Sequence, residues 1–380
     1  MMRPLEGIKV LDFSQYLAGP SATLRLADLG ASVIKIERPG KGDGCRNLRV
    51  PGCEIEGESP LFCAVNRNKD GITLDLKAPE NKAVIKKLIE EADVAVFSFR
   101  PGTAEKLGLS YEQVKEINPG IIYGEVSGYG NKGPWSSRPG QDLLAQCISG
   151  LPYLNGDKED APAPLGLSLA DMFAGQHLVQ GILAALIYRE KSQKGSYIQV
   201  NLLESILDIQ FEVFTTFLND GHAAPVRSAV NNANAYISAP YGIYETKDGY
   251  MALAMSSIVK LGELLGCDDL LRYEDEKEWS TKRDEIKQIL KEHLLKDTAG
   301  HWLSILEEAD IWCAKVLNWR ELFETEGFRQ MEMLQDIYRN GKKVFRTTRC
   351  PIRIDGEKYC SEKPVPFMGQ DNEKYLKEVQ

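Results

Sequence analysis

The sequence predicts an α/β protein built on a parallel sheet, with a second, smaller domain. From residue 8 to residue 127, short apolar runs alternate with segments of helical periodicity. The chain opens with an apolar run at residues 8–13, a helix at 21–30 and a second apolar run at 32–36. A strand, a helix and a strand in this order form a crossover, which places helices on the faces of parallel strands. The length of 380 residues indicates two domains, or one large domain with an insertion.

The first half of the chain supplies most of this alternation. Pro20 stands near the start of the first helix, where its fixed backbone angle is favourable. Further strands are expected at residues 72–76, 94–99, 121–127 and 197–202, and helices at 80–91, 103–107, 111–117, 142–149, 165–195 and 203–219. Residues 46–69 and the glycine-, serine- and proline-rich segment 128–140 are expected to be irregular. The glycines of RPGKGDG, residues 38–44, do not open a helix after the first strand, which argues against a nicotinamide cofactor.

A change of composition near residue 221 marks the expected start of the smaller domain. Residues 221–234 are interpreted as a linker, and YGIYETKDGYMALA, residues 241–254, predicts a hairpin that turns at Asp248-Gly249. Helices are expected at residues 257–265, 280–295, 298–309 and 319–331, followed by a strand-like tail from residue 335. The predicted domains are the first part of the large domain at 1–220, a small α+β domain at 221–318, and a segment at 319–380 that returns to the large domain.

Composition limits the classes of partner. The formal net charge is −9 and basic residues are not clustered, which argues against nucleic acid as the main partner. The opening MMRPLEGIKVLDF contains no apolar signal segment, and no apolar run reads as long enough to span a bilayer. We therefore expect a cytoplasmic protein without a membrane-spanning helix. The eight cysteines form no C-x-x-C pair, which predicts free thiols rather than a zinc site or a disulfide framework.

Residues 165–195 predict an unusual helix that combines small residues with large apolar ones. Small residues allow a helix to approach its neighbours closely, so most of this helix is expected to be buried. Lys194-Gly195 is a plausible end, with a cation and a glycine at the carboxyl terminus. Asp171 stands in the first turn. Its carboxylate either offsets the helix dipole or is a chemical group held at the edge of a buried element.

Several ordered motifs occur along the chain: PLEGIKVLDFSQYLAGPSATLRLADLGASVIKIERPGKGD, NRNKDGITLDL, SFRPGTAEKLGL, INPGIIYGEVSGYG, LSLADMFAGQHLVQGILAAL and APYGIYETKDGYMALA, with VLNWRELFE matching more loosely. Together they resemble one family, the class III CoA-transferases of the CaiB/BaiF type. The resemblance spans nearly the whole chain. It implies a Rossmann-like large domain made from both chain ends, a smaller domain from the middle, and an interlocked homodimer. It also implies transfer of CoA between an acyl-CoA and a carboxylic acid, with CoA as a substrate and no permanently bound cofactor.

The family's nucleophile is an aspartate in a motif that here reads Ser168-Leu169-Ala170-Asp171. The resemblance therefore implies that Asp171 attacks the donor thioester. An aspartyl mixed anhydride and then an aspartyl-CoA thioester would follow, and no metal is required. The anhydride hydrolyses readily, so the site has to exclude water.

Two other functions are compatible with parts of this resemblance. The related α-methylacyl-CoA racemases carry a histidine in a G-H-D segment that here reads Gly140-Gln141-Asp142. Gln141 cannot exchange a proton near pH 7, which argues against a racemase. Gln141 and Asp142 are candidates for aiding the transition state, Gln141 by stabilising an oxyanion through its amide N–H and Asp142 by orienting a substrate or Asp171. The alternative for Asp142 is that it caps the helix it begins. A non-catalytic acyl-CoA-binding protein is the alternative from another class.

The resemblance also implies a set of contacts to CoA. These residues are Tyr16, Leu17, Ala18, Arg38, Leu74, Ser98, Phe99, Arg100 and Lys106. The three cations suit the 3′-phosphate and the pyrophosphate, and Phe99 offers an apolar face to adenine or pantetheine. For each cation the alternative is a solvated surface charge.

Two features depart from the formyl-CoA:oxalate members of the family. Those members carry a glutamine where this chain has Leu17, and a glycine-rich lid where this chain reads Ala254-Met255-Ser256-Ser257. Both differences argue against oxalate as the acceptor. A larger or less polar acid fits better beside Leu17.

Overall fold

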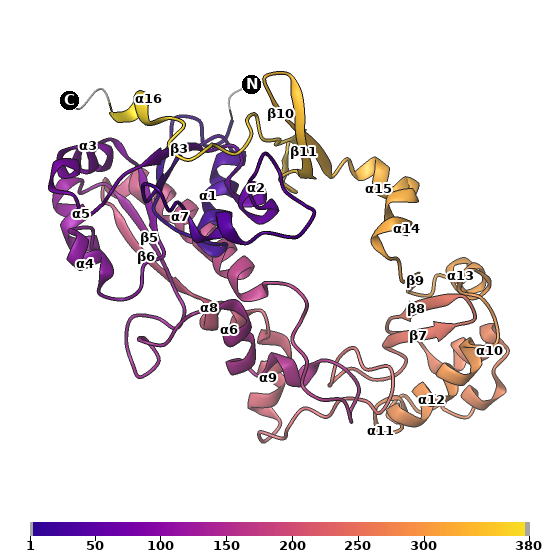
Figure 1. Cartoon of the computed structure of the whole chain (residues 1–380). Coiled ribbons are helices and arrows are strands. Elements are labelled where there is room, and N and C mark those ends of the chain that lie inside the picture. Colours follow the sequence, from indigo (N-terminus) through magenta and orange to yellow (C-terminus); the bar gives the residue numbers. More distant parts are fainter. Residues whose placement is uncertain (1–2, 377–380) are drawn as a thin grey trace. The chain divides into compact units, whose positions relative to one another are not determined.

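The computed structural model describes residues 3–376, which fold into two compact units (Figure 1). Unit 1 contains the described residues of Met1–Ala145 and Gln330–Gln380, together with Ser168–Asp208. Unit 2 contains Gln146–Leu167 and Ile209–Arg329. Both ends of the chain therefore contribute to unit 1, and its middle supplies unit 2.

Unit 1 is organised around a parallel sheet. Within the described residues its strand order is β3-β2-β1-β4-β5-β6, which is the order of dinucleotide-binding folds. The strands are β1 (Lys9–Asp12), β2 (Ser32–Glu37), β3 (Asp70–Thr73), β4 (Val94–Phe97), β5 (Ile122–Ser127) and β6 (Ser196–Asn201). Every residue of β4 is buried, as expected for a strand covered on both faces. The chain winds outward in one direction from β1 and in the other from β4, and ligands of such sheets bind beyond the carboxyl ends of the strands at this reversal.

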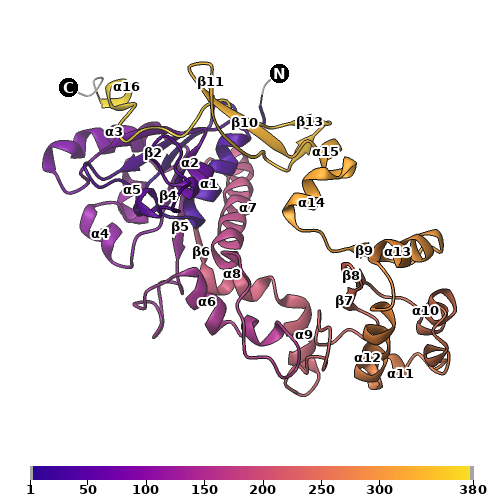
Figure 2. The same cartoon turned by 45° about the vertical axis from the view of Figure 1, so that its right-hand side comes forward.

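Helices cover both faces of this sheet. On one face, α1 (Ala18–Asp28) and α7 (Leu169–Ser192) contact each other, and α7 also contacts β5 and β6 (Figure 2). On the other face, α3 (Lys82–Glu91) and α5 (Tyr111–Ile117) pack into one apolar cluster with alternate residues of β1 and β4. The other helices of unit 1 are α2 (Pro60–Asn66), α4 (Thr103–Leu107), α8 (Leu202–Asp208) and α16 (Asn372–Leu376), and α6 (Asp142–Ile148) crosses the boundary between the units.

The helix α7 is the longest element of unit 1. Its 24 residues make it the one helix in the described part of the chain that is long and apolar enough to cross a membrane. The expectation that no apolar run is long enough to span a bilayer is therefore wrong by length and composition. However, α7 buries Ala170, Ala174 and Leu178, and it contacts α1, α8, β5 and β6. These contacts make it the core helix of unit 1.

The C-terminal segment covers the edge of the sheet at β3. The Gly71 N–H donates to Asp371 Oδ2 at 2.7 Å, and the Asp371 N–H donates to the Gly71 carbonyl at 2.9 Å. The Thr73 N–H donates to Asn372 Oδ1 at 2.8 Å. These bonds satisfy backbone groups that an edge strand leaves open. Two hairpins precede this segment, β10 (Leu334–Arg339) with β11 (Lys342–Thr348) and β12 (Arg353–Ile354) with β13 (Glu357–Lys358).

Unit 2 is built on an antiparallel sheet in the order β7-β8-β9. The strands are β7 (Gly242–Thr246), β8 (Gly249–Leu253) and β9 (Cys313–Lys315), and β7 and β8 form the predicted hairpin at Asp248-Gly249. The helices are α9 (Phe211–Asn219), α10 (Ile258–Leu265), α11 (Glu278–Thr281), α12 (Arg283–Leu294), α13 (Ala299–Glu308) and α14 (Trp319–Glu324), and α15 (Glu326–Met331) reaches into unit 1. Short 3₁₀ turns lie at Gly44–Asn47, Pro79–Asn81, Leu151–Leu154 and Asp268–Leu270.

Two helices predicted as continuous are each divided in two. The segment 203–219 forms α8 and α9, because α8 buries Leu202, Leu203 and Ile206 in unit 1 whereas α9 buries none of its residues and belongs to unit 2. The segment 319–331 is interrupted at Thr325, whose Oγ1 accepts the Phe328 N–H at 3.2 Å. A helix-capping side chain therefore begins α15 at this position.

A helix also lies where the sequence predicts irregular structure. In α2, Ser59 caps the first turn by accepting the Phe62 N–H at 3.1 Å, and Pro60 is the first helical residue. Both are recognised start signals. The helix buries Phe62 and Cys63 against the C-terminal hairpin β10–β11.

The unit boundaries differ from the predicted domain boundaries because the predicted linker is ordered. The buried guanidinium of Arg227 donates to the carbonyl oxygens of Asn155, Lys158 and Asp160. The Asn232 N–H donates to Asp157 Oδ1 at 2.8 Å. These bonds join the segment Gln146–Leu167 to unit 2, although the sequence analysis placed it in the large domain.

Candidate active site

The connections that leave β1 and β4 bring most of the predicted CoA contacts together. Tyr16, Leu17 and Ala18 follow β1, and Ser98, Phe99 and Arg100 follow β4. The two connections are joined directly, because the Gln15 N–H donates to Ser98 Oγ at 2.9 Å. These six residues therefore share the carboxyl edge of the sheet at its point of reversal, where α/β proteins of this topology bind ligands.

The three predicted phosphate-binding cations are exposed at or near the same edge. Arg38 directly follows β2, Arg100 follows β4, and Lys106 lies on α4. Within residues 3–376, none of the three forms an ion pair with a carboxylate. Their charges are thus available to an anionic ligand in a protein that is acidic as a whole.

The apolar members of the predicted set differ in their exposure. Tyr16 is 52% exposed and Phe99 is half-buried, its ring centroid 5.7 Å from that of Phe97. Leu17 is 9% exposed. The Leu74 side chain is 3% exposed and belongs to the apolar core of unit 1. Any contact of Leu74 with a ligand therefore has to use its backbone.

Asp171 lies in the first turn of α7, at the same edge as the β1 connection. Both α1 and α7 are crossovers between parallel strands, so both run antiparallel to the strands and begin at their carboxyl edge. They meet closely at Gly175, where a Cβ atom would lie 2.8 Å from the Ala18 carbonyl oxygen and 2.3 Å from Ser21 Oγ. Asp171 is one turn earlier on the same face of α7. Its carboxylate is therefore next to the start of α1.

Asp142 is bound to the start of α7. Its Oδ1 accepts the Ala170 N–H at 2.7 Å and the Asp171 N–H at 3.3 Å. The side chain is 6% exposed. This carboxylate satisfies two N–H groups that the first turn of a helix leaves without intrahelical partners. From the sequence, Asp142 was expected to cap α6, the helix that it begins, if it had a structural role. Its hydrogen bonds to the first turn of α7 were not predicted.

Gln141 has a local structural role. Its side chain is exposed, and its Oε1 accepts the Leu143 N–H at 3.1 Å in the first turn of α6. The Gln141 carbonyl accepts the Ala145 N–H at 3.0 Å. Gln141 therefore caps α6 and fixes the position of Asp142 next to it.

The electrostatic surroundings of Asp171 favour its protonated form. Burial, together with the negative charge of Asp142, raises the pKa of Asp171 to about 7. A carboxyl group with this pKa is substantially ionised at neutral pH and is more basic than an ordinary aspartate. It suits nucleophilic attack or proton transfer near pH 7.

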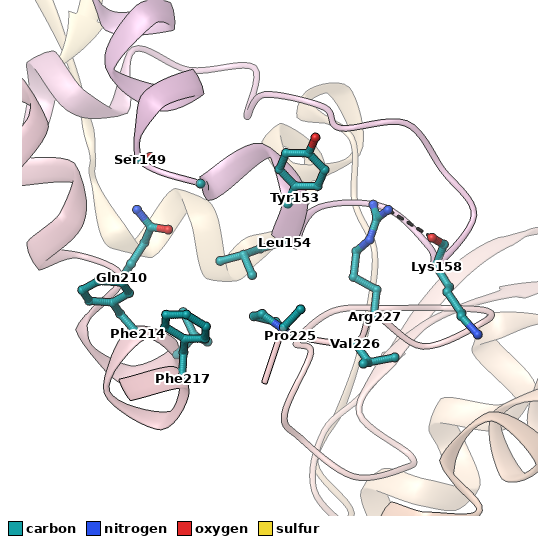
Figure 3. Close-up of a pocket in the computed structure, with 13 residues that line it drawn as sticks. Ser149, Tyr153, Leu154, Lys158, Gln210, Phe214, Phe217, Pro225, Val226 and Arg227 are labelled. Atoms are coloured by element: carbon teal, nitrogen blue, oxygen red, sulfur yellow. Dashed lines mark hydrogen bonds between the residues drawn. The ribbon is translucent and has the colours of Figure 1, made fainter. Parts of the chain in front are cut away.

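Unit 2 contains a separate apolar pocket of about 520 Å³ (Figure 3). Phe214 and Phe217 of α9 line it, together with Tyr153, Leu154 and Pro225. Lys158 and Arg227 also border it, but the Arg227 guanidinium is occupied by backbone carbonyls. Its described lining includes none of the predicted site residues.

A family model described as CoA-transferase family III matches residues 5–372. The chain belongs to this family. Mouse succinyl-CoA:glutarate CoA-transferase is 31% identical over 387 residues, covering 100% of this chain and 87% of the relative. Acetyl-CoA:oxalate CoA-transferase of Acetobacter aceti is 32% identical over 368 residues, covering 95% of this chain and 92% of the relative.

Solved structures of the family have the same fold. The crystal structure of a CAIB/BAIF family protein from Brucella suis superimposes with a TM-score of 0.86 at 30% identity, covering 100% of both chains. The predicted resemblance to CaiB/BaiF-type CoA-transferases is therefore confirmed, as is a mixed α/β fold with a central parallel sheet. The chain is a class III CoA-transferase, an enzyme that uses CoA thioesters.

Among the described residues, His177 is the histidine that lies in unit 1 with Asp171, so it is the one there that could replace the histidine missing at Gln141. His177 lies on α7, but its Nε2 is 3.2 Å from Asp208 Oδ2 and its Nδ1 is 3.0 Å from Ser205 Oγ. Ser205 is buried and Asp208 is exposed, so this Ser-His-Asp group offers no accessible nucleophile. The other three histidines belong to unit 2. Within residues 3–376, no group of three His, Cys, Asp or Glu residues is placed to hold a metal ion.

A group of buried charges lies near the β1 connection, and none of its members was among the predicted site residues. Asp12, Lys35, Asp43 and Lys69 are each at most 2% exposed. Lys69 Nζ is 2.9 Å from Asp12 Oδ2, and Lys35 Nζ is 2.8 Å from Asp43 Oδ2. A charged residue inside an apolar strand, as in SVIKIE, was the signal available in the sequence, because such residues are rarely buried unless they are paired.

Proposed function

We propose that this enzyme moves CoA from an acyl-CoA donor to a free carboxylic acid through covalent intermediates on Asp171. The observation that supports this most strongly is the surroundings of Asp171. The carboxylate is partly buried at the start of a core helix, next to the connection that carries the predicted CoA contacts. Burial and the charge of Asp142 raise its pKa to about 7, so it is both available and basic at neutral pH.

In the first half-reaction, a carboxylate oxygen of Asp171 attacks the carbonyl carbon of the donor thioester. The carbon–sulfur bond breaks, CoA leaves as a thiolate, and Asp171 and the donor acyl group form a mixed anhydride. The thiolate then attacks the Cγ carbonyl of Asp171, the carbon–oxygen bond of the anhydride breaks, and the donor acid leaves as a carboxylate. CoA is now held as a thioester of Asp171, so one difficult exchange has been divided into easier steps.

The second half-reaction runs the same steps in reverse with a different acid. The acceptor carboxylate attacks Cγ of the Asp171 thioester, the thiolate leaves, and a second anhydride forms. The thiolate then attacks the acceptor's acyl carbon, which releases the new acyl-CoA and restores the Asp171 carboxylate. No net proton transfer is required. Water has to be excluded from both anhydrides, because hydrolysis would waste the thioester.

CoA binding is assigned to the carboxyl edge of the sheet. Arg38, Arg100 and Lys106 supply cations for the 3′-phosphate and the pyrophosphate. The remaining contacts are assigned to Tyr16, Leu17, Ala18, Leu74, Ser98 and Phe99, with Leu74 acting through its backbone. CoA is a substrate here, and the chemistry uses no permanently bound cofactor.

We assign Asp142 and Gln141 supporting parts in this chemistry. Asp142 fixes the first turn of α7 through the Ala170 and Asp171 N–H groups, and its charge makes Asp171 more basic. Gln141 holds α6 and thereby Asp142, and its exposed amide N–H is a candidate donor to a developing oxyanion.

Relatives guide the choice of substrates to test. Their names include succinyl-CoA, glutarate, acetyl-CoA and oxalate. Leu17 is buried beside the proposed site, and Ser257 in the segment 254–257 caps α10 instead of belonging to a glycine-rich loop. We propose that succinate or glutarate is accepted in preference to oxalate.

We also propose that two copies of the chain form an interlocked homodimer in the cytoplasm. The helix α9 supports the dimer. Phe211, Phe214 and Leu218 are 68%, 40% and 48% exposed, and no described residue of α9 is buried. An exposed apolar surface of this kind is typical of a protein–protein interface. Sedimentation velocity tests the dimer, and a monomer at micromolar concentration would contradict it.

A transfer assay tests the function directly. The enzyme is incubated with succinyl-CoA or acetyl-CoA and with succinate, glutarate or oxalate, and CoA thioesters are separated by chromatography. We expect a new thioester with the wild type and with Asp208→Ala, which removes an exposed carboxylate of α8, and none with Asp171→Ala. Transfer by Asp171→Ala would overturn the proposal. Exchange of the α-hydrogen of a 2-methylacyl-CoA in deuterium oxide, without transfer, would indicate a racemase.

A further inference from the structure

The glycine-rich loop RPGKGDG has no part in the proposed chemistry beyond Arg38 at its start. It follows β2 and ends at the 3₁₀ turn Gly44–Asn47. Asp43 within it is 2% exposed and is bound on both carboxylate oxygens. Its Oδ1 accepts the Tyr16 N–H at 3.1 Å and the Cys45 N–H at 2.9 Å, and its Oδ2 accepts from Lys35 Nζ at 2.8 Å. The loop is therefore attached to the connection between β1 and α1.

Tyr16 adopts a backbone conformation that needs a stabilising contact such as its hydrogen bond to Asp43. Its φ angle is +66°, in the left-handed region that an aromatic residue rarely occupies. The bond from its N–H to Asp43 holds this conformation. The Tyr16 ring lies over Gly44, where a Cβ atom would come within 2.5 Å of Tyr16 Oη. A side chain at position 44 would therefore displace the Tyr16 ring from this place.

Lys35 binds the neighbouring residue of the same turn. It is fully buried in β2, and its Nζ donates to the Ser14 carbonyl as well as to Asp43. The Ser14 N–H donates to Asp12 Oδ1 at 3.0 Å, and the Gln15 N–H donates to Ser98 Oγ. Side chains thus bind four backbone groups of the turn, the N–H and carbonyl of Ser14 and the N–H groups of Gln15 and Tyr16.

The turn leads directly into the part of α1 that faces Asp171. Leu17 and Ala18 follow Tyr16, and the Ala18 carbonyl lies against α7 at Gly175. A shift of the turn therefore moves Leu17 and Ala18 relative to the Asp171 carboxylate. Displacements of about 1 Å are enough to slow an enzymatic reaction roughly 100-fold.

We propose that Lys35 and Asp43 are positioning residues for acyl transfer, which hold the Ser14–Tyr16 turn so that the bound thioester meets Asp171. This inference rests on the proposed role of Asp171. Neither side chain touches the substrate. Both act through the backbone of the turn, Lys35 at Ser14 and Asp43 at Tyr16.

Two double variants test this role without leaving a lone buried charge. Removing one partner of a buried pair strands the other and can prevent folding. Lys35→Met with Asp43→Leu removes both charges and both bonds to the turn. Lys35→Met with Asp43→Asn also removes both charges but keeps a carbonyl oxygen for the Tyr16 N–H. At saturating acyl-CoA, we expect the leucine variant to form the Asp171 adduct at least about 30-fold more slowly than the wild type, and the asparagine variant to recover most of this loss.

The ion pair at the other end of α1 is the matched control. Asp28 is 0% exposed and Arg67 is 2% exposed, with Arg67 Nη2 3.4 Å from Asp28 Oδ2. Asp28→Asn with Arg67→Met should lower the unfolding temperature while leaving the rate of adduct formation within about twofold of the wild type. Gly44→Ala provides a milder variant that touches no buried charge and displaces the Tyr16 ring. We expect it to slow adduct formation as well.

Amide hydrogen exchange provides a readout that does not depend on activity. In a peptide covering residues 13–17, exchange should be more than about tenfold faster in the leucine double variant and unchanged in the Asp28/Arg67 control. The positioning role would be overturned if the leucine double variant and Gly44→Ala both formed the adduct at the wild-type rate. This holds whether or not the amide hydrogens of the turn exchange faster. Absence of any adduct in the wild type would instead overturn the proposed function of Asp171.

Discussion

Asp12 and Asp171 lie at the same edge of one sheet, and their pKa values move in opposite directions. Asp12 is fully buried, with Lys69 Nζ 2.9 Å and Thr23 Oγ1 2.7 Å from its Oδ2. Burial opposes its ionisation, but the charges of Lys35 and Lys69 outweigh burial and lower the pKa of Asp12 well below its usual range. Burial raises the pKa of Asp171 to about 7 together with the charge of a second carboxylate, Asp142, and no cation among the described residues opposes them.

The difference separates a structural carboxylate from the one that we propose to be reactive. Asp12 is surrounded by donors and cations, so its negative charge stabilises the connection after β1. Among the described residues Asp171 has no such partner, so its charge is costly in the resting enzyme and, in the proposed mechanism, is available for bonding to a carbonyl carbon. Perturbed pKa values of this kind are concentrated at functional sites, although structural ion pairs such as Asp12–Lys69 perturb pKa values too.

Replacing Asp171 with asparagine gives the largest expected effect. CoA transfer should fall by about 10³-fold or more, because no carboxylate remains to form the anhydride.

The same substitution should also change stability. The folded-state pKa of Asp171 lies above its unfolded value, so ionised Asp171 destabilises the fold. Asp171→Asn should therefore be more stable than the wild type at pH 8, and most of this difference should be gone near pH 4, where the folded state is protonated and the unfolded state is only about half ionised. Urea unfolding at the two pH values measures this; a less stable variant at pH 8 would contradict it.

Replacing Asp12 with asparagine should act on stability. The change leaves Lys69 without its buried counter-ion, which costs about 3 kcal/mol in the free energy of unfolding at pH 7. Because the folded-state pKa of Asp12 is lowered, its stabilisation is present above the ordinary value near 4 and is lost as the pH falls through the folded-state pKa. Wild type and variant should converge in acid. If the wild type and Asp12→Asn were equally stable at pH 7, the Asp12–Lys69 ion pair would contribute nothing to the free energy of unfolding.

Gly175→Ala tests the close approach of α1 to α7. The added Cβ would lie 2.8 Å from a backbone oxygen, so the helices have to separate and the free energy of unfolding should fall by about 1–3 kcal/mol. Gly300→Ala is the matched control, because Gly300 lies in α13 with no atom within 4 Å of the added Cβ. That change should stabilise by up to about 1 kcal/mol through helix propensity. Comparable losses in both variants would contradict the packing at Gly175.

Asp142→Asn gives the smallest expected effect. Asparagine keeps a carbonyl oxygen for the Ala170 and Asp171 N–H groups but removes the negative charge. The pKa of Asp171 should fall, so the acid limb of the pH profile of adduct formation should move down by less than about 1 unit. Profiles between pH 5 and 9 measure the shift. An acid limb that stays in place or moves up would show that the charge of Asp142 does not raise the pKa of Asp171.

The sequence alone allowed prediction of the features that depend on local pattern. The alternation of apolar runs and helices predicted the parallel sheet, and Asp-Gly at residues 248–249 predicted the β7–β8 hairpin. The position of Asp171 in the first turn of a helix also followed from the pattern of small and large apolar residues, but the expectation that most of this helix is buried is wrong, because only eight of the 24 residues of α7 are buried. Its proposed role came from the family resemblance and not from the pattern.

The features that escaped prediction depend on residues far apart in the chain. The bond from the α7 backbone to Asp142 joins residues separated by 28 positions, and no local pattern encodes it. The Lys69–Asp12 pair joins residues 57 positions apart. The division of residues 203–219 into α8 and α9 follows from burial in unit 1 at one end only, which helix periodicity cannot show.

Intact-protein mass spectrometry after mixing with succinyl-CoA or acetyl-CoA tests the central claim most directly. The account predicts a mass increase equal to CoA less one water, or to the acyl group, mapped by peptide sequencing to Asp171 and absent from Asp171→Asn. Addition of an acceptor acid should discharge the CoA adduct as a new thioester. Transfer of CoA without any adduct on Asp171, or an adduct that persists in Asp171→Asn, would contradict the account.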